Sequence, residues 1–108
     1  MEAGCGVGNA MFPILEENQN PHLMIHGRDY SPRAIEVLLA DPQFNPKHAT
    51  AGVWDITSPL LPEGIAEVSV DVITLCFVLS ALVLPHFYCI DRRNLNNGNN
   101  LSLICIVS

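Results

Sequence analysis

Three glycines near the start of the chain have the spacing of a ligand-binding loop. Gly4, Gly6 and Gly8 occupy alternate positions and are followed by Asn9. Glycines in such a loop allow positive φ angles and let a ligand approach the backbone N–H groups closely. A dinucleotide-binding fold needs G-x-G-x-x-G, which would put a glycine where Asn9 stands. The spacing favours an S-adenosylmethionine site, with a glycine-rich turn that binds nothing as the alternative.

Two aspartates follow the glycine loop, each at the expected end of a strand. A carboxylate at the position of Asp29 accepts hydrogen bonds from ribose hydroxyls in nucleotide-binding α/β folds. Asp55 ends the next expected strand, where it can receive the exocyclic amino group of an adenine. Either aspartate alone is as well explained as the cap of a helix or turn. Two acids that close successive strands on the same edge as the glycine loop favour a nucleotide-like ligand.

Other polar residues form no comparable pattern. His22 and His26 have a helical metal-ligand spacing, but their segment is strand-like and no third ligand follows. Asp71 enters an apolar strand, where an acid more often caps or pairs with a neighbouring loop. We therefore predict no metal site and leave the catalytic residues unassigned.

Composition narrows the partners and the compartment. The net charge of −6 argues against a nucleic-acid surface on this segment, because phosphate binding needs clustered Lys and Arg. The four cysteines contain no C-x-x-C pair and predict reduced thiols in the cytoplasm, with mitochondria or the nucleus as alternatives. The apolar run over residues 72–84 is shorter than the roughly 20 residues that a membrane-spanning helix needs, so no membrane span is predicted.

Strands and helices are expected to alternate, which predicts an α/β fold with a parallel sheet. The expected strands cover residues 1–3, 23–28, 49–54 and 68–77, and the expected helices cover residues 10–17 and 32–40. Asn9 is the expected N-cap of the first helix, and Ser31 followed by Pro32 begins the second. In the second helix Ile35, Leu38 and Leu39 form the apolar stripe expected to pack on the sheet.

Four motifs occur in order over about residues 2–82. They are Glu2-Ala3-Gly4-Cys5-Gly6-Val7-Gly8-Asn9 with Phe12-Pro13, then Asp29-Tyr30-Ser31-Pro32-Arg33-Ala34-Ile35-Glu36, then Asp55-Ile56-Thr57, and last Ser69-Val70-Asp71-Val72 continuing to Phe77-Val78-Leu79-Ser80-Ala81. Together they resemble the tRNA N3-methylcytidine methyltransferases, a methyltransferase-like family that acts on the anticodon loop. That family usually has Asp-Phe-Ser and Asp-Leu-Thr in the second and third motifs.

The resemblance implies a Rossmann-like class I methyltransferase fold, S-adenosyl-L-methionine as cofactor, and methyl transfer to N3 of cytidine. By the same resemblance Gly4 lines the methionine part of the cofactor and Asp29 holds the ribose. Asp55 and Ile56 contact the adenine, and Cys76 stands where the family has an apolar residue against the cofactor. The implied partner is tRNA, bound through the full-length parent, and an auxiliary protein such as a tRNA synthetase is a further candidate.

The chain departs from the family pattern at both ends, so we expect a partial domain. The family's first strand is reduced to residues 1–3, and the resemblance stops after residue 82. We expect a partial S-adenosylmethionine-binding domain over residues 1–84, and over residues 85–108 a divergent tail that is non-native or disordered, or that forms an edge strand. Two further readings are a class I methyltransferase with another substrate and a non-catalytic truncated product or interaction fragment.

We predict that the isolated chain binds S-adenosylmethionine weakly or not at all, because the strand that should support the loop is so short. Isothermal titration calorimetry measures this directly. Micromolar binding that is lost in Asp29→Ala would contradict the prediction.

Overall fold

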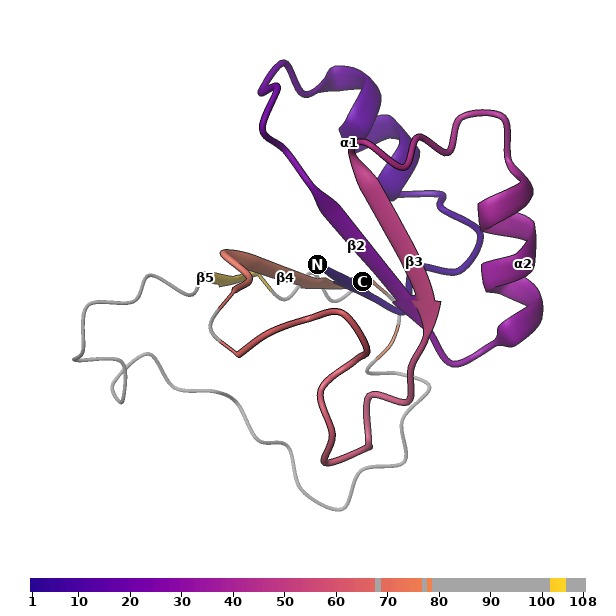
Figure 1. Ribbon diagram of the computed structural model, residues 1–108, viewed down its shortest axis with the longest axis vertical. Coiled ribbons are helices and arrows are strands. Elements are labelled where there is room, and N and C mark those ends of the chain that lie inside the picture. Colours follow the sequence, from indigo (N-terminus) through magenta and orange to yellow (C-terminus); the bar gives the residue numbers. More distant parts are fainter. Residues whose placement is uncertain (68, 77, 79–101, 105–108) are drawn as a thin grey trace.

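The chain folds into a parallel sheet with helices between its first strands (Figure 1). The computed structural model describes residues 1–67, 69–76, 78 and 102–104. Its elements are β1 (Glu2–Ala3), α1 (Met11–Glu17), β2 (Ile25–Asp29), α2 (Pro32–Ala40), β3 (Ala49–Val53), β4 (Val72–Leu75) and β5 (Ser102–Ile104). The expected α/β class is confirmed.

The strand order is β3-β2-β1-β4-β5, and every pair of neighbours runs parallel. The chain moves outward from β1 to β3 on one side and returns to the other side of β1 with β4. The order therefore reverses between β1 and β4, which is where open α/β sheets bind ligands, at the carboxyl ends of the strands. The loop that leaves β1 is the glycine loop.

The central strand is the shortest part of this arrangement. Glu2 and Ala3 pair with Gly27 and Arg28 of β2 on one side. On the other side the same two residues pair with Thr74 and Leu75 of β4. The two halves of the sheet are thus joined through two residues.

Helix α2 begins as the sequence predicts. The Ser31 hydroxyl accepts a hydrogen bond from the Ala34 N–H at 3.2 Å, and Pro32 is the first helical residue. The expected N-cap of α1 is wrong: Ala10 holds that position, with no side-chain cap. Here the chain enters the helix through the turn at Gly8, whose carbonyl accepts the Phe12 N–H at 3.0 Å, so Asn9 lies before the cap.

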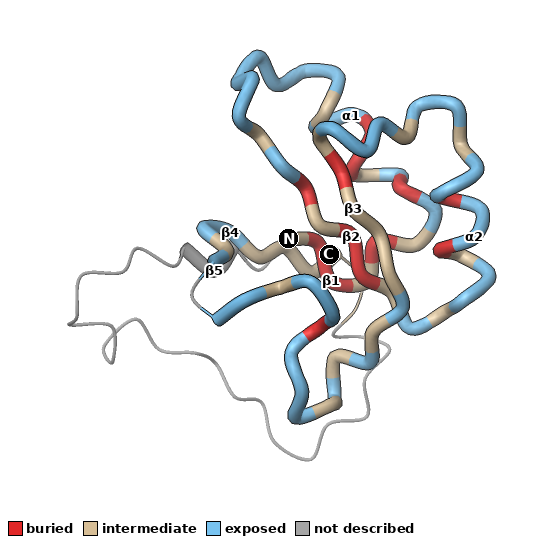
Figure 2. The backbone as a smooth tube through the Cα atoms, in the orientation of Figure 1, coloured by how far each residue is buried: buried red, intermediate tan, exposed pale blue. Residues whose placement is uncertain are grey.

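The apolar core lies between the two helices and one face of the sheet. Figure 2 shows buried residues gathered where β1, β2 and the helices meet. The core consists of Cys5, Met11, Phe12, Ile25, Ile35, Leu38 and Ala49. The expected stripe on α2 is wrong at Leu39, which is 48% exposed. Leu38 and Leu39 point about 100° apart around the helix axis, and α2 turns Leu38 toward the sheet.

The opposite face of β2 and β3 is polar. Arg28 is buried and donates hydrogen bonds to the Gly27 carbonyl, the Thr50 hydroxyl and the Glu63 carbonyl, at 2.7, 3.2 and 3.0 Å. His26 also contacts the Thr50 hydroxyl, at 2.8 Å. The bond to Glu63 ties the connection between β3 and β4 across this face.

The later part of the chain differs in extent from the prediction. The fourth strand, expected over residues 68–77, is formed by Val72–Leu75 and is exposed or half-buried, since α1 and α2 pack mainly against β2 and β3. In the expected tail, Ser102–Ile104 form an edge strand beside β4. The rest of the tail and the boundary at residue 84 lie outside the described residues. Within the described part, no helix is long and apolar enough to span a membrane.

Gly27→Ala is expected to destabilise the fold by about 1–3 kcal/mol, the usual range for overpacking. A Cβ at Gly27 would lie 2.5 Å from the Met11 sulfur and 3.0 Å from the Cys5 sulfur. In the matched control, Gly52→Ala, the added Cβ meets only the Arg28 side chain, at 3.7 Å or more. Urea unfolding of both variants measures the difference, and equal midpoints would contradict this packing.

Candidate functional site

The predicted site residues gather at one edge of the sheet. The glycine loop leaves β1, Asp29 ends β2, Asp55 follows β3, and Cys76 comes directly after β4. Because the strands are parallel, all four segments emerge on the same side. The Trp54 N–H donates to the Asp29 carbonyl at 2.8 Å, which holds the segment leading to Asp55 beside the end of β2.

The glycine loop is a tight turn held by backbone hydrogen bonds. The N–H groups of Gly4 and Cys5 both donate to the Arg28 carbonyl, at 2.7 and 3.0 Å, and the Gly8 N–H donates to the Cys5 carbonyl at 3.0 Å. Gly4, Gly6 and Gly8 have φ angles of +78°, +53° and +96°. Residues with a Cβ adopt this region only under strain, so the turn depends on glycine at each of these positions.

The three glycines differ in what surrounds them. A Cβ at Gly4 would collide with the Val78 side chain, and a Cβ at Gly8 would lie 2.5 Å from the Phe12 ring. A Cβ at Gly6 would have no neighbour within 4 Å. Gly4 and Gly8 therefore serve close packing, whereas Gly6 borders open space that a ligand can enter.

Asp29 binds the loop to the start of α2. Its Oδ2 accepts the Gly6 N–H and its Oδ1 accepts the Ser31 N–H, both at 2.8 Å. Each carboxylate oxygen has about two lone-pair sites, so each keeps one for a further donor. The sequence pointed to Asp29 as a ligand to ribose, and the structure adds that the same carboxylate shapes the loop. The sequence analysis did not predict the hydrogen bond between Gly6 and Asp29, because the two residues are 23 positions apart and no local pattern indicates it.

Asp55 lies two residues beyond β3 and is exposed. Its Oδ1 accepts the backbone N–H of Thr57 at 2.8 Å and the Thr57 hydroxyl at 2.7 Å. These two hydrogen bonds lower the pKa of Asp55. In this structure Asp55 therefore forms the local turn that the sequence offered as the alternative, and its Oδ2 accepts no hydrogen bond from the described residues. Ile56 and Cys76 are half-buried, and the Cys76 thiol is free.

A second carboxylate, which the sequence analysis missed, is that of Glu2 in β1, the strand that leads into the loop. Glu2 is 5% exposed, and its Oε2 has no hydrogen-bond partner among the described residues. Burial raises the pKa of Glu2 to about 7, the amino terminus opposes this rise, and Asp29 adds to it. The sequence did contain a signal for this buried acid, because Glu2 stands in the segment expected to form the central strand.

The thiol of Cys5, which lies near Glu2 and Asp29, is a weak nucleophile. Burial, with the negative charges of Asp29 and Glu2, raises the pKa of Cys5 to about 12. A thiol with that pKa stays protonated near neutrality and is a poor nucleophile. Cys5, which is part of the loop, thus contributes its side chain to the apolar core. Within the described ranges, no three His, Cys, Asp or Glu side chains converge as metal ligands.

The chain is similar in sequence to known methyltransferases. A family described as "Methyltransferase domain" matches residues 1–94. A tRNA(Thr) (cytosine(32)-N(3))-methyltransferase of Saccharomyces cerevisiae is 48% identical over 83 residues, covering 75% of this chain and 13% of that protein. A tRNA N(3)-methylcytidine methyltransferase of Schizosaccharomyces pombe is 46% identical over 82 residues, with 76% and 27% covered.

A human protein with a similar name also matches the chain. A tRNA N(3)-cytidine methyltransferase of Homo sapiens is 43% identical over 95 residues, covering 82% of this chain and 33% of that protein. The chain therefore spans between about an eighth and a third of the length of these relatives. The resemblance predicted from the four motifs is confirmed.

Glu2 is expected to make stability fall as the pH rises from about 4.5 to about 7. The folded chain keeps the proton up to the higher value, whereas the unfolded chain releases it near the lower one, so folding loses favour across this window. The loss should be roughly 2 kcal/mol. This loss of stability should be absent in Glu2→Gln. It should remain in the control Glu16→Gln, which changes an exposed side chain.

Thermal unfolding of the three proteins at pH 5 and pH 8 measures this loss. His26, whose pKa is lowered by burial, acts in the opposite direction in all three and cancels in the comparison. The same pH dependence in Glu2→Gln as in the unmodified chain would show that Glu2 is not the group responsible.

Proposed function

The chain belongs to the methyltransferase-domain family, and from this we propose that it forms the cofactor side of an S-adenosylmethionine-dependent tRNA (cytidine) N3-methyltransferase. The observation that carries the proposal is the identity of 43–48% to enzymes of that name, over segments of 82 to 95 residues. Such identity goes beyond a shared fold, which by itself does not indicate a substrate.

The loop geometry supports the choice of cofactor. S-adenosylmethionine carries ribose hydroxyls, which donate hydrogen bonds, and Asp29 keeps one acceptor site on each oxygen. Gly6 borders open space on the same side as Asp29. In this proposal Gly4 and its loop line the methionine part and Asp29 holds the ribose. Asp55, Ile56 and Cys76 enclose the adenine side.

The reaction needs little acid–base chemistry from the protein. The bound cofactor supplies an electrophilic methyl group on a sulfonium sulfur. Cytosine N3 has a lone pair in the plane of the ring, which is available when the base is unpaired, as in an anticodon loop. No base is required to generate this nucleophile, so catalysis depends on alignment and on the electrostatics of the site. The protein's contribution here is to hold the cofactor in place and to exclude water.

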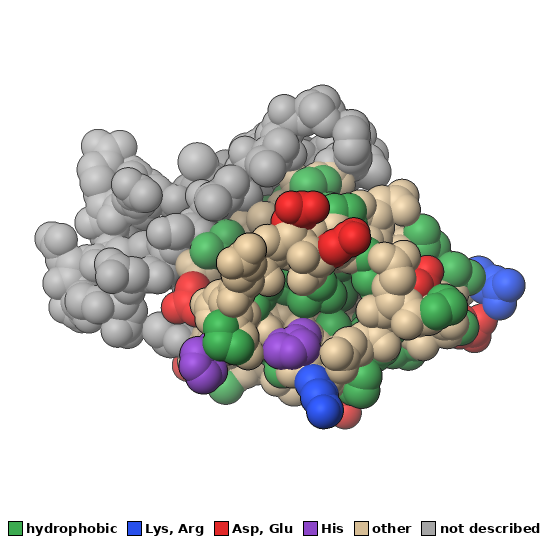
Figure 3. Space-filling model, turned by 90° about the horizontal axis from the view of Figure 1, so that it is seen from above, with side chains coloured by type: hydrophobic (Ala, Val, Ile, Leu, Met, Phe, Trp, Pro, Cys, Tyr) green, Lys and Arg blue, Asp and Glu red, His purple; other side chains and the backbone are tan. Residues whose placement is uncertain are grey.

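The tRNA surface is proposed to lie on other parts of the enzyme. In the described segment Arg28 is buried, Arg33 pairs with Glu36 at 3.1 Å, and Lys47 is exposed. Lys and Arg side chains lie apart from one another on the face shown in Figure 3. Binding of the tRNA backbone needs several clustered cations. An auxiliary protein such as a tRNA synthetase is a further proposed contributor.

A chimera tests the proposal. The segment of the S. cerevisiae relative that aligns with this chain is replaced by this chain's own residues, and N3-methylcytidine in tRNA(Thr) is measured by nucleoside mass spectrometry. The chimera is expected to methylate. Asp29→Asn within it should lose at least about tenfold in rate, because a neutral amide holds the ribose less well than a carboxylate.

Glu36→Gln, on the exposed side of α2, is the matched control and should retain full activity. A folded chimera that binds S-adenosylmethionine but leaves tRNA unmodified would overturn the proposed substrate. A folded chimera that does not bind S-adenosylmethionine would overturn the proposed cofactor site.

A further inference from the structure

The first part of the connection between β3 and β4, residues 54–67, carries part of the proposed cofactor site. Figure 1 shows this connection on the side of the sheet away from α2. Asp55 and Ile56, which are proposed to enclose the adenine side, lie at its beginning. The contacts that hold the connection against the sheet therefore bear on the cofactor site.

Residues 54–60, the Asp55 loop, are closed on themselves by hydrogen bonds. Inside the loop, the Ser58 N–H donates to the Asp55 carbonyl at 2.9 Å. The indole N–H of Trp54 donates to the Leu60 carbonyl at 3.0 Å, which joins the two ends of the loop. The position of Asp55 therefore depends on how the whole loop is attached to the sheet.

Two hydrogen bonds attach the Asp55 loop to β2. At the start of the loop, the Trp54 backbone N–H donates to the Asp29 carbonyl at 2.8 Å. Beyond its end, the Arg28 guanidinium donates to the Glu63 carbonyl at 3.0 Å. Both attachments come from the last two residues of β2, and the second one depends on the Arg28 side chain.

The pleat of β2 directs the Arg28 side chain to this face. A Cβ at Gly27 would lie 2.5 Å from the Met11 sulfur in the core, so Gly27 faces the helices. Side chains alternate along a strand, and Arg28 therefore faces the opposite side. Arg28 pairs with Gly52 of β3, where an added Cβ would lie 3.7 Å from the Arg28 Nε. The guanidinium thus lies across β3 at a residue that has no side chain.

The Arg28 guanidinium is buried among uncharged oxygens. The residue is 5% exposed, and it donates to the Gly27 carbonyl, the Thr50 hydroxyl and the Glu63 carbonyl. A buried charge is costly unless it is hydrogen-bonded, and bonds from a charged donor are about twice as strong as neutral ones. Release of the connection would leave this buried charge with one partner fewer. The bond to Glu63 is therefore a strong attachment.

A turn that begins at Pro62 presents the Glu63 carbonyl to the sheet. The Ile65 N–H donates to the Pro62 carbonyl at 3.1 Å, and Gly64 has a φ angle of +77°. A positive φ at the third residue is typical of a type II turn and favours glycine there. The Glu63 carbonyl takes no part in the turn's own hydrogen bond, so it can accept the one from Arg28.

We propose that Arg28 is a positioning residue for the cofactor: its guanidinium fastens the Asp55 loop to β2 and keeps Asp55 and Ile56 at the adenine side of the site. The naming of the cofactor rests on the proposed function, whereas the attachment does not. The Arg28 carbonyl also accepts the N–H groups of Gly4 and Cys5. One residue therefore supports the methionine side through its backbone and the adenine side through its side chain.

The fluorescence of Trp54, the single tryptophan of the chain, measures the attachment without cofactor or tRNA. Arg28→Met removes the donors and keeps an unbranched side chain. Acrylamide should quench Trp54 at least about twofold more strongly in this variant, because the loop opens more often once it has lost one of its two attachments. Arg33→Met makes the same replacement at an exposed position of α2 and should leave quenching unchanged. Unchanged quenching in a folded Arg28→Met chain would overturn the proposal.

A second variant removes the same attachment from the side of the connection. Gly64→Val places a β-branched residue at a positive φ, which disrupts the turn that presents the Glu63 carbonyl. It should raise quenching as Arg28→Met does, and the double variant should add little, because both changes remove one bond. Additive effects would overturn the proposal. Circular dichroism shows whether each chain is folded, and if Arg28→Met unfolds, unchanged quenching in Gly64→Val would overturn the proposal instead.

Enzyme kinetics test the role in cofactor binding. In the S. cerevisiae chimera that carries this chain, Arg28→Met should raise KM for S-adenosylmethionine at least about fivefold and change kcat by less than about twofold. The adenine lies at the far end of the cofactor from the sulfonium, so the loss should fall on binding. An unchanged KM, or a fall in kcat alone, would overturn the positioning role. An inactive chimera would overturn the proposed function, and the quenching of Trp54 would then decide the attachment by itself.

Discussion

The pairing of a two-residue strand with neighbours on both sides is the constraint on which the rest of the structure depends. Glu2 and Ala3 join β2 to β4, and the glycine loop begins at the next residue. The Arg28 carbonyl accepts two N–H groups of that loop, and the Asp29 carboxylate accepts a third. The end of β2 therefore sets the loop geometry, and β2 pairs with β1 on one side and with β3 on the other.

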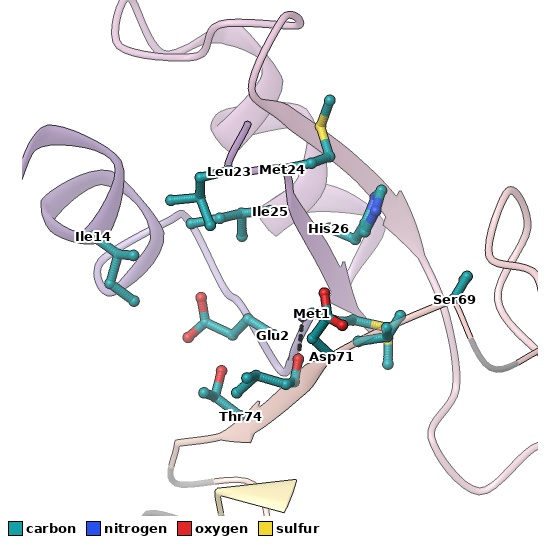
Figure 4. A pocket seen from close by; sticks show the side chains of 12 residues that line it. Met1, Glu2, Ile14, Leu23, Met24, Ile25, His26, Ser69, Asp71 and Thr74 are labelled. Carbon is teal, nitrogen blue, oxygen red and sulfur yellow. Dashed lines mark hydrogen bonds between the residues drawn. The ribbon is translucent and has the colours of Figure 1, made fainter. Parts of the chain in front are cut away.

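The same short strand links the two edges of the sheet. At the carboxyl edge it delivers the loop, and at the amino edge it borders a groove of about 320 Å³ whose lining includes Ile14 and Val72 (Figure 4). Glu2 lies between them, buried and with one oxygen lacking a partner among the described residues. A buried carboxylate without partners opposes folding when it is charged. The strand that delivers the glycine loop thus also carries this buried carboxylate.

Membership of the methyltransferase-domain family and the parallel order β3-β2-β1-β4-β5 agree with each other. Open α/β sheets bind ligands where the strand order reverses, and there the structure gathers Gly6, Asp29 and Ser31 through hydrogen bonds. Asp55 joins this group only through the backbone contact of Trp54, and its carboxylate forms a turn with Thr57. Asp29 is therefore bound directly to the glycine loop, whereas the Asp55 carboxylate binds Thr57 in its own turn.

The sequence by itself determined the features that have local causes. The positive φ angles of the glycine loop, the start of α2 at Ser31 and Pro32, and the position of Asp29 at a strand end each follow from residue types at short spacing. Only the tertiary structure decided which α2 side chains reach the core, that Gly6 and Asp29 bind each other, and that Glu2 is buried. Those features depend on segments that lie far apart in the chain, and their energies come from burial and pairing that exist only after the strands have assembled. The N-cap of α1 was predicted wrongly although its turn is local: the Gly8 N–H donates to the Cys5 carbonyl, and the Gly8 carbonyl accepts the Phe12 N–H.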